Sequence, residues 1–163
     1  MTVNLARDVV VCAQMFDNHV QDHIQDKQRE LDEISQKLSN DAKLLRKLRD
    51  HQDSKKDVDL TPIRADIEQF KEQFIEVQNS LQEGLKSSFD FDKLKYDKID
   101  RDTLQDLIEE VEASKTYLQN RVQPTIMEIE TKIQLMKLLS EICKHMLSQQ
   151  SDSIKNWINR GSR

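Results

Sequence analysis

His19 and His23 have the spacing in this sequence that comes nearest to a site for chemistry. Two histidines four residues apart lie on one face of a helix, which is the arrangement used by helical zinc sites. The metalloprotease motif also needs a glutamate directly after the first histidine, and Val20 occupies that position. Asp22 and Asp26 lie close, but no third ligand cluster is evident. We therefore expect solvated surface histidines, with a metal site as the alternative, and predict no cofactor.

Paired carboxylates recur along the chain, as at Glu109 and Glu110, and could in principle support general acid–base catalysis. That chemistry needs a desolvated cleft. Basic side chains three and four residues away on a helix instead make such carboxylates part of a solvated face. A phosphate-binding loop needs several glycines, and the chain has 2 Gly in 163 residues. We predict that the protein is not an enzyme.

The scarcity of turn residues favours long helices. The chain has 2 Gly and 2 Pro, with 34% charged and 5% aromatic residues, and it lacks the composition of a sheet protein. We expect an all-α protein: one elongated helical domain over residues 1–163, an antiparallel coiled coil or helical bundle of about four helices. The long N- and C-terminal helices should pair. Because only 36% of the residues are hydrophobic, the core should be a narrow seam between helices.

Charge and hydropathy limit the classes of partner. The 25 basic and 30 acidic residues are interspersed and leave a net charge of -5, so nucleic acid is not expected. No stretch approaches the roughly 18 apolar residues of a membrane span, and the apolar run at residues 9–13 lacks the features of a cleaved signal. Cys12 and Cys143 lie in apolar stretches. We expect buried free thiols, with a disulfide between them as the alternative.

A heptad pattern predicts a first helix from about Leu5 to about His51. Three of its seam positions, meaning the a and d positions that face a partner helix, are polar: Asp17, Lys27 and Asp41. Such residues either fix the register or mark places where the seam frays. The predicted seam consists of Val10, Ala13, Asp17, Val20, Ile24, Lys27, Leu31, Ile34, Leu38, Asp41, Leu45 and Leu48.

A polar break at residues 52–57 separates this helix from a second one, and the two should form a helical hairpin over about residues 5–84. Thr61 and Pro62 read as the N-cap and first helical residue of the second helix. Gly84 reads as its end. Its predicted seam is Ile63, Ile67, Phe70, Phe74, Val77 and Leu81.

Residues 85–99 should connect the hairpin to the C-terminal helices, which we place at about residues 100–159. Aromatic residues alternate with polar ones in this connection, which favours a linker packed on the bundle, with a short strand or hairpin as the alternative. Asp100 is expected to cap a third helix. Pro124 either kinks that helix or marks the start of a last one, running from about Thr125 to Asn159.

The last helix carries an apolar stripe too broad for one partner helix. We expect it to be covered from two sides, inside the bundle or by another subunit. Our candidates for a partner interface are Leu139, Cys143, Met146 and Trp157, and the alternative is that they complete the chain's own core. The stripe comprises Ile126, Ile129, Ile133, Leu135, Met136, Leu138, Leu139, Ile142, Cys143, Met146 and Leu147.

Residues 98–160 resemble the C-terminal part of type III secretion needle-tip and translocator-filament proteins. The resemblance lies in residues 98–108 (KIDRDTLQDLI), 117–120 (YLQN), 133–140 (IQLMKLLS) and 150–160 (QSDSIKNWINR). In that family a long C-terminal helix pairs antiparallel with an N-terminal one, and its end contacts neighbouring subunits. This chain is shorter than most members and lacks their central globular insertion.

The resemblance implies a bacterial secretion-apparatus component or secreted substrate that acts in virulence and forms a homo-oligomer through helix–helix packing with protein partners. It also implies a location in the bacterial cytoplasm before export, then outside the cell or at its surface. The alternative is an intracellular coiled-coil adaptor or secretion chaperone that binds one partner helix and stays in the cytoplasm.

Overall fold

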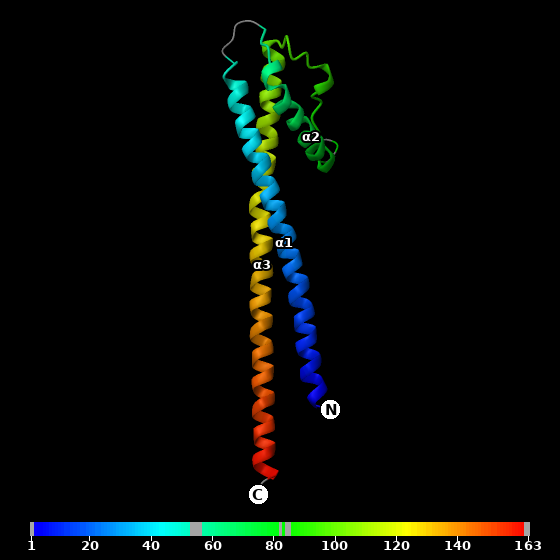
Figure 1. Ribbon diagram of the computed structural model, residues 1–163, viewed down its shortest axis with the longest axis vertical. Coiled ribbons are helices and arrows are strands. Elements are labelled where there is room, and N and C mark those ends of the chain that lie inside the picture. Colours follow the sequence, from blue (N-terminus) through cyan, green and yellow to red (C-terminus); the bar gives the residue numbers. More distant parts are fainter. Residues whose placement is uncertain (1, 53–56, 82, 84–85, 162–163) are drawn as a thin grey trace. The chain divides into compact units, whose positions relative to one another are not determined.

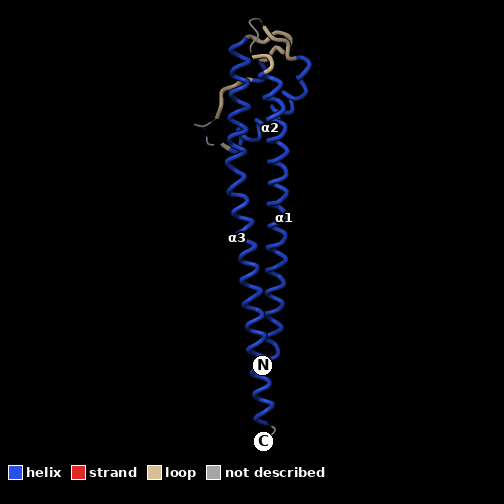
Figure 2. Tube along the Cα trace, turned by 90° about the vertical axis from the view of Figure 1, so that its left-hand side faces the viewer, coloured by secondary structure: helices blue, strands red, loops and turns tan. Residues whose placement is uncertain are grey.

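The computed structural model is all-helical and describes residues 2–52, 57–81, 83 and 86–161 (Figure 1). The described residues form three α-helices and two short 3₁₀ helices: α1 (Thr2–Arg49), η1 (Thr61–Ile63), α2 (Arg64–Ser80), η3 (Phe91–Lys93) and α3 (Arg101–Gly161). They contain no strand, only an isolated antiparallel bridge between Val58 and Ile99. The prediction of an all-α fold with paired N- and C-terminal helices is confirmed (Figure 2).

The expected number of about four helices is wrong, because Pro124 lies inside the single helix α3. Proline removes one backbone hydrogen bond and clashes with the preceding turn, which costs about 3 kcal/mol in a helix interior. The exposed Pro124 ring is followed by Thr125 and Ile129, which are buried, and preceded by the buried Leu118. Packing on both sides of the proline accounts for the continuous helix.

The chain divides into two compact units, unit 1 (residues 1–30 and 124–163) and unit 2 (residues 31–123). Each unit contains a stretch of α1 beside a stretch of α3. Unit 2 also contains α2 and the connection that follows it. The expectation of one elongated domain stays a prediction.

Unit 2 has a hydrophobic core to which all its segments contribute. α2 packs antiparallel on α1, because Lys37 pairs with Glu76 and Lys47 with Asp66. The core comprises Leu44, Leu45, Leu48, Val58, Leu60, Ile67, Phe70, Phe74, Phe91, Ile99, Leu104, Leu107, Ile108 and Val111.

The connection after α2 is a linker that packs its aromatic side chains onto this core, as predicted. Phe91, in η3, has its ring centroid 5.9 Å from that of Phe70 and 5.1 Å from that of Phe74. The linker is held to the segment before α2 by two backbone hydrogen bonds between Val58 and Ile99, at 2.8 and 2.9 Å. These contacts explain why a region with only a weak strand pattern is ordered without a sheet.

The helix ends agree with the predictions in part. Asp100 caps α3 as expected, since its carboxylate accepts a hydrogen bond from the Thr103 N–H at 2.8 Å. Thr61 is not the N-cap of α2, because η1 intervenes, and the Thr61 N–H donates instead to the Asp59 side chain at 2.9 Å. α2 ends at Ser80, and Gly84 lies outside the described residues.

The predicted seam of α1 is confirmed in both units. All twelve positions are buried or half-buried, including the polar residues Asp17, Lys27 and Asp41. Burial of every a and d position is what a heptad pattern requires of a helix that packs along one face. The seam therefore does not fray at its polar positions.

Candidate functional site

Unit 1 is a pair of antiparallel helices joined by a small cluster of charged side chains. His23 Nε2 of α1 lies 2.9 Å from Glu128 Oε1 of α3, and Lys27 Nζ lies 3.2 Å from Glu128 Oε2 and 3.0 Å from Glu30 Oε2. Hydrogen bonds from His23 and Lys27 lower the pKa of Glu128, and those to Glu30 and Glu128 raise the pKa of Lys27. The polar seam residue Lys27 thus has partners on both helices, which fixes the local register.

The two histidines singled out from the sequence do not converge on one site. His23 is half-buried and faces Glu128, whereas His19 is exposed. Among the side chains that the structure describes, no group of three or more His, Cys, Asp or Glu residues could hold a metal ion. His23 therefore serves as a contact between helices.

A groove of about 270 Å³ opens along the helix pair of unit 1. Two of the three seam residues that α1 contributes here, Ala13 and Asp17, are small or polar, so they fill little of the space opposite the larger residues of α3. Two of the predicted interface residues, Leu139 and Cys143, line the groove and are half-buried. The full lining is Val10, Ala13, Gln14, Asp17, Met136, Leu139, Ser140, Cys143 and Leu147.

The other two predicted interface residues are exposed. Met146 is 42% exposed and Trp157 is 79% exposed. Trp157 lies near the end of α3, where residues 151–160 are all exposed. The alternative that the four candidates complete the chain's own core is therefore wrong for Met146 and Trp157.

The broad stripe of α3 is covered on one side only. Ile129 is buried against α1, but most of the stripe outside the a and d positions is exposed. The exposed large hydrophobic residues of unit 1 are Val11, Met15, Phe16, Met127, Ile133, Leu135, Leu138, Ile142, Met146, Leu147, Ile154, Trp157 and Ile158. Large exposed apolar patches are typical of interaction sites.

Four of these residues share one flank of the helix pair. Phe16 directly precedes the seam residue Asp17 of α1, as His23 precedes Ile24. Leu135 and Ile142 directly precede the half-buried Met136 and Cys143 of α3, as Glu128 precedes the buried Ile129. In an antiparallel pair such positions face each other on the same flank, and the contact between His23 and Glu128 shows which flank it is. Leu138 is one helical turn from both Leu135 and Ile142. We call Phe16, Leu135, Leu138 and Ile142 the apolar flank.

The cysteines differ from expectation. Both are free thiols, but Cys12 is exposed, and only Cys143 is partly covered. Cys12 lies in an apolar run, yet it stands between the seam positions Val10 and Ala13 on the side of α1 that turns away from α3. The expectation of a buried thiol is wrong for Cys12 because it followed local composition rather than heptad position.

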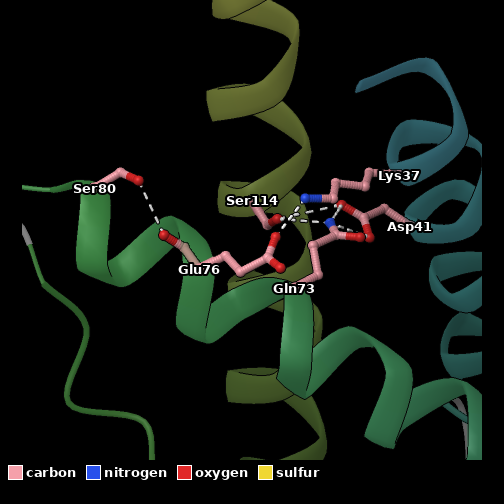
Figure 3. A network of polar contacts seen from close by, with 6 residues as sticks. All are labelled: Lys37, Asp41, Gln73, Glu76, Ser80 and Ser114. Carbon is pink, nitrogen blue, oxygen red and sulfur yellow. Dashed lines mark hydrogen bonds and ion pairs between the residues drawn. The ribbon is translucent and has the colours of Figure 1, made fainter. Parts of the chain in front are cut away.

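Unit 2 contains a buried polar network that links all three helices (Figure 3). Gln73 Nε2 of α2 donates to both carboxylate oxygens of Asp41 of α1, each at 3.0 Å, and Ser114 Oγ of α3 donates to Asp41 at 3.3 Å. Asp41 is 1% exposed. Burial raises its pKa to about 6, and the hydrogen bonds from Gln73 and Ser114 oppose that rise.

The network fixes how α2 sits on α1 and α3, because a buried carboxylate without partners would be costly. Lys37 and Glu76 pair at its edge, beside Gln73 (Figure 3). Of the three residues in this network, only Asp41 was indicated by the sequence pattern. Ser114 could have been found, since it completes the heptad steps of Leu104, Leu107, Val111 and Leu118. No heptad pattern in the sequence indicated Gln73.

A larger cavity of about 510 Å³ lies beside α2 and the linker, but its charged side chains engage one another. Tyr96 donates its hydroxyl to Glu68 at 2.8 Å, and Arg64 lies over the Tyr96 ring at 5.0 Å. Lys71 pairs with Asp92 at 2.6 Å. The cavity wall is therefore a set of internal contacts that hold the linker on α2.

No family model, curated protein or solved structure matches this chain. The resemblance to type III secretion proteins accordingly stays a prediction from the sequence.

No helix among the described residues is both long enough and apolar enough to cross a membrane.

Proposed function

We propose that this protein acts without catalysis, as a helical assembly protein that packs the apolar flank of unit 1 against helices of other protein chains. The observation that carries the proposal is the exposure of Leu138 (54%), Ile142 (47%), Phe16 (43%) and Leu135 (42%) on one flank. Fully burying such a side chain contributes about 1.5–3 kcal/mol relative to full exposure, so covering the exposed half of each one contributes about half of that. A partner helix laid along this flank would cover all four.

We propose further that this assembly belongs to a bacterial type III secretion system, as a needle-tip or filament-like component or as a secreted substrate. Support comes from the sequence resemblance over residues 98–160. In this proposal the chain is made in the bacterial cytoplasm and then exported.

The alternative is a coiled-coil adaptor or secretion chaperone that stays in the cytoplasm and captures one partner helix. The groove of unit 1 supports the adaptor or chaperone role. It lies between α1 and α3, is lined by residues that include Val10, Leu139 and Cys143, and is a place where one additional helix can bind.

Contact through the apolar flank is tested by placing a photo-crosslinking amino acid at Leu138 in the producing bacterium. We expect an adduct larger than the chain itself. Glu130 is the matched control, because it is exposed on α3 outside the apolar flank. No adduct from Leu138, or equal adducts from both positions, would contradict the proposal.

A paired substitution, Leu138→Glu with Ile142→Glu, separates binding from folding. Both side chains are about half-exposed, so the free energy of unfolding should change by less than about 0.5 kcal/mol. Assembly should nevertheless be lost, because two carboxylates would have to be desolvated in the interface. A variant that still assembles would show that the partner binds elsewhere.

Export is tested separately, by fusing the first ~20 residues to a reporter in strains with and without an active type III apparatus. Secretion only in the competent strain supports the secretion role. Retention in both strains would contradict it and leave the adaptor as the better account.

A further inference from the structure

The buried polar network of unit 2 is a junction that holds α2 on both of the other helices. Asp41 of α1 is 1% exposed, and its carboxylate accepts hydrogen bonds from Gln73 of α2 at 3.0 Å and from Ser114 of α3 at 3.3 Å. Gln73 also donates to Ser114 at 3.4 Å. Figure 3 shows these side chains converging from three helices. Movement of α2 away from α1 and α3 therefore breaks the network.

Both side chains that donate to Asp41 are uncharged. Lys37, one turn earlier on α1, pairs with Glu76 of α2 instead (Figure 3). Lys115 of α3 attracts the carboxylate but makes no ion pair with it. An ionised carboxylate at this depth therefore lacks a cationic partner, and neutral donors offset the cost of its burial only in part. Burial accordingly raises the pKa of Asp41 to about 6.

The ion pairs between α2 and α1 lie at the surface, outside the network. The pairs Lys37 with Glu76 and Lys47 with Asp66 have side chains that are 33–66% exposed, so solvent screens them. The apolar side chains that α2 buries do not titrate. Protonation of Asp41 is therefore the change through which pH should act most strongly on the position of α2.

A small cavity lies beside Asp41, between α1 and α2. Its volume is about 50 Å³, and Gln73 also lines it. The charged groups of its wall, besides Asp41 itself, are Lys43, Lys47 and Asp66. A water molecule needs about 10–15 Å³ of such space. Water can therefore come close to Asp41 while α2 is in place.

We infer that α2 is a pH-dependent cover of unit 2, which stays closed while Asp41 is protonated and opens more often when Asp41 is ionised. In the open state the carboxylate exchanges its two neutral partners for water, which removes the cost of burying its charge. The residues that α2 covers, together with its own apolar face, then become accessible to other molecules. The open state stays a minor one, because α2 buries Ile67, Phe70, Phe74 and Val77 when it is closed.

Hydrogen exchange of single backbone amides measures this opening in the full chain. Protection factors, corrected for the intrinsic exchange rate at each pH, are compared at about pH 5 and about pH 7. If the pKa of Asp41 is 3.8 in the open state and about 6 in the closed state, opening is about tenfold more frequent at the higher pH. We expect the amides of Phe70 and Phe74 to lose this factor in protection.

The amide of Leu107 in α3 reports unfolding of unit 2 as a whole, because its side chain is fully buried in the shared core. If α2 opens by itself, the amides of Phe70 and Phe74 should be at least about tenfold less protected than that of Leu107 at both pH values. Equal protection at both pH values would mean that α2 opens only when unit 2 unfolds, and would overturn the cover.

Asp41→Asn is the decisive variant, because the amide has the same shape but does not titrate. Protection of the α2 amides should then be the same at both pH values. Glu76→Gln is the matched control, since it alters another carboxyl at the edge of the network and leaves Asp41 with both donors, so the tenfold change should remain. A change with pH that persists in Asp41→Asn, or that is absent from the unmodified chain, would overturn the inference.

Ser114→Ala provides a second test that does not need Asp41→Asn to fold. This variant removes one donor to the ionised carboxylate, so burial of the charge costs more. The loss of α2 protection should therefore extend to higher pH than in the unmodified chain, and an unchanged profile would contradict the role of the network. None of these results bears on the crosslink from Leu138, which tests contact through the apolar flank of unit 1.

Discussion

Units 1 and 2 use the same two helices in opposite ways. Of the 19 buried hydrophobic residues in the described chain, only Val20 and Ile129 belong to unit 1. Of the 14 exposed large hydrophobic residues, only Ile75 belongs to unit 2. Unit 2 buries its apolar side chains in its own core, while unit 1 leaves its large apolar side chains exposed to solvent. Among the described residues, the buried core thus lies almost entirely in unit 2 and the exposed apolar surface almost entirely in unit 1.

The difference follows from the number of elements that cover the helix pair. Two helices bury mainly the a and d positions that face each other, so the flanking positions stay exposed. In unit 2, α2 and the linker cover these flanks, and Phe70, Phe74 and Phe91 close the core. Unit 1 has no such cover among the described residues. A heptad pattern therefore predicts which face of a helix is buried, but not how many elements pack against that helix.

The largest expected effect on stability comes from truncating a side chain in the core of unit 2. Leu107 is fully buried, so Leu107→Ala should cost about 2–5 kcal/mol in free energy of unfolding through lost burial and a cavity. The same truncation at Leu138 of unit 1, where the side chain is 54% exposed, should cost less than about 0.5 kcal/mol. Urea unfolding followed by circular dichroism measures both. Similar costs at the two positions would break the contrast between the units.

The next effect is a pH dependence confined to unit 2. Burial raises the pKa of Asp41 from 3.8 to about 6 in the folded chain, so folding favours its protonated form. The stabilisation is fully present below the unfolded pKa and is lost as the pH rises through about 6. Stability should therefore fall between about pH 4 and pH 7, by at most about 3 kcal/mol. Urea midpoints across this range measure the effect.

Asp41→Asn is the control for this pH dependence. The amide keeps the shape of the side chain but does not titrate, so the difference in slope between variant and unmodified chain isolates Asp41. The groups around it, Lys37, Lys115 and Glu76, remain in both proteins. The carboxyls whose pKa is lowered, such as Asp59 and Asp100, titrate below this window. Equal slopes would show that Asp41 is not desolvated.

The smallest expected effect concerns the ion pairs of unit 1. Glu128→Gln removes the charge that His23 and Lys27 share across the helix pair. Because solvent screens these partly exposed ion pairs, we expect only a slight fall in the thermal midpoint, a small fraction of that for Leu107→Ala. High salt should erase it. Glu130→Gln, on an exposed face of α3, serves as the control. A large loss would mean that unit 1 depends on this cluster.

Much of the fold could be predicted from the sequence because helical periodicity is a local signal. The twelve seam positions of α1 and the cap at Asp100 follow directly from spacing and residue type. The uninterrupted course of α3 through Pro124 could not, because local propensity forbids what packing on both sides permits. The start of α2 was missed for a related reason, since η1 takes the place of the expected cap at Thr61.

The candidate surface was predicted only in part. The width of the apolar stripe on α3 correctly indicated more surface than α1 can cover. It could not show which residues lie in the groove, such as Leu139, and which are open, such as Trp157. Leu139 lies in the groove because it is opposite residues of α1 such as Ala13 and Asp17, which are more than 120 residues away in the chain. Gln73 was missed because its partners come from two other helices.

The position of Trp157 makes the chain's single tryptophan a natural optical probe. Its indole is 79% exposed and lies in unit 1, far along the sequence from the phenylalanine-rich core of unit 2. Its fluorescence should therefore stay red-shifted, and nearly unchanged, while the core of unit 2 melts. A blue shift with rising protein concentration would instead report that another molecule has covered the indole. One native residue can thus distinguish association from folding without any label.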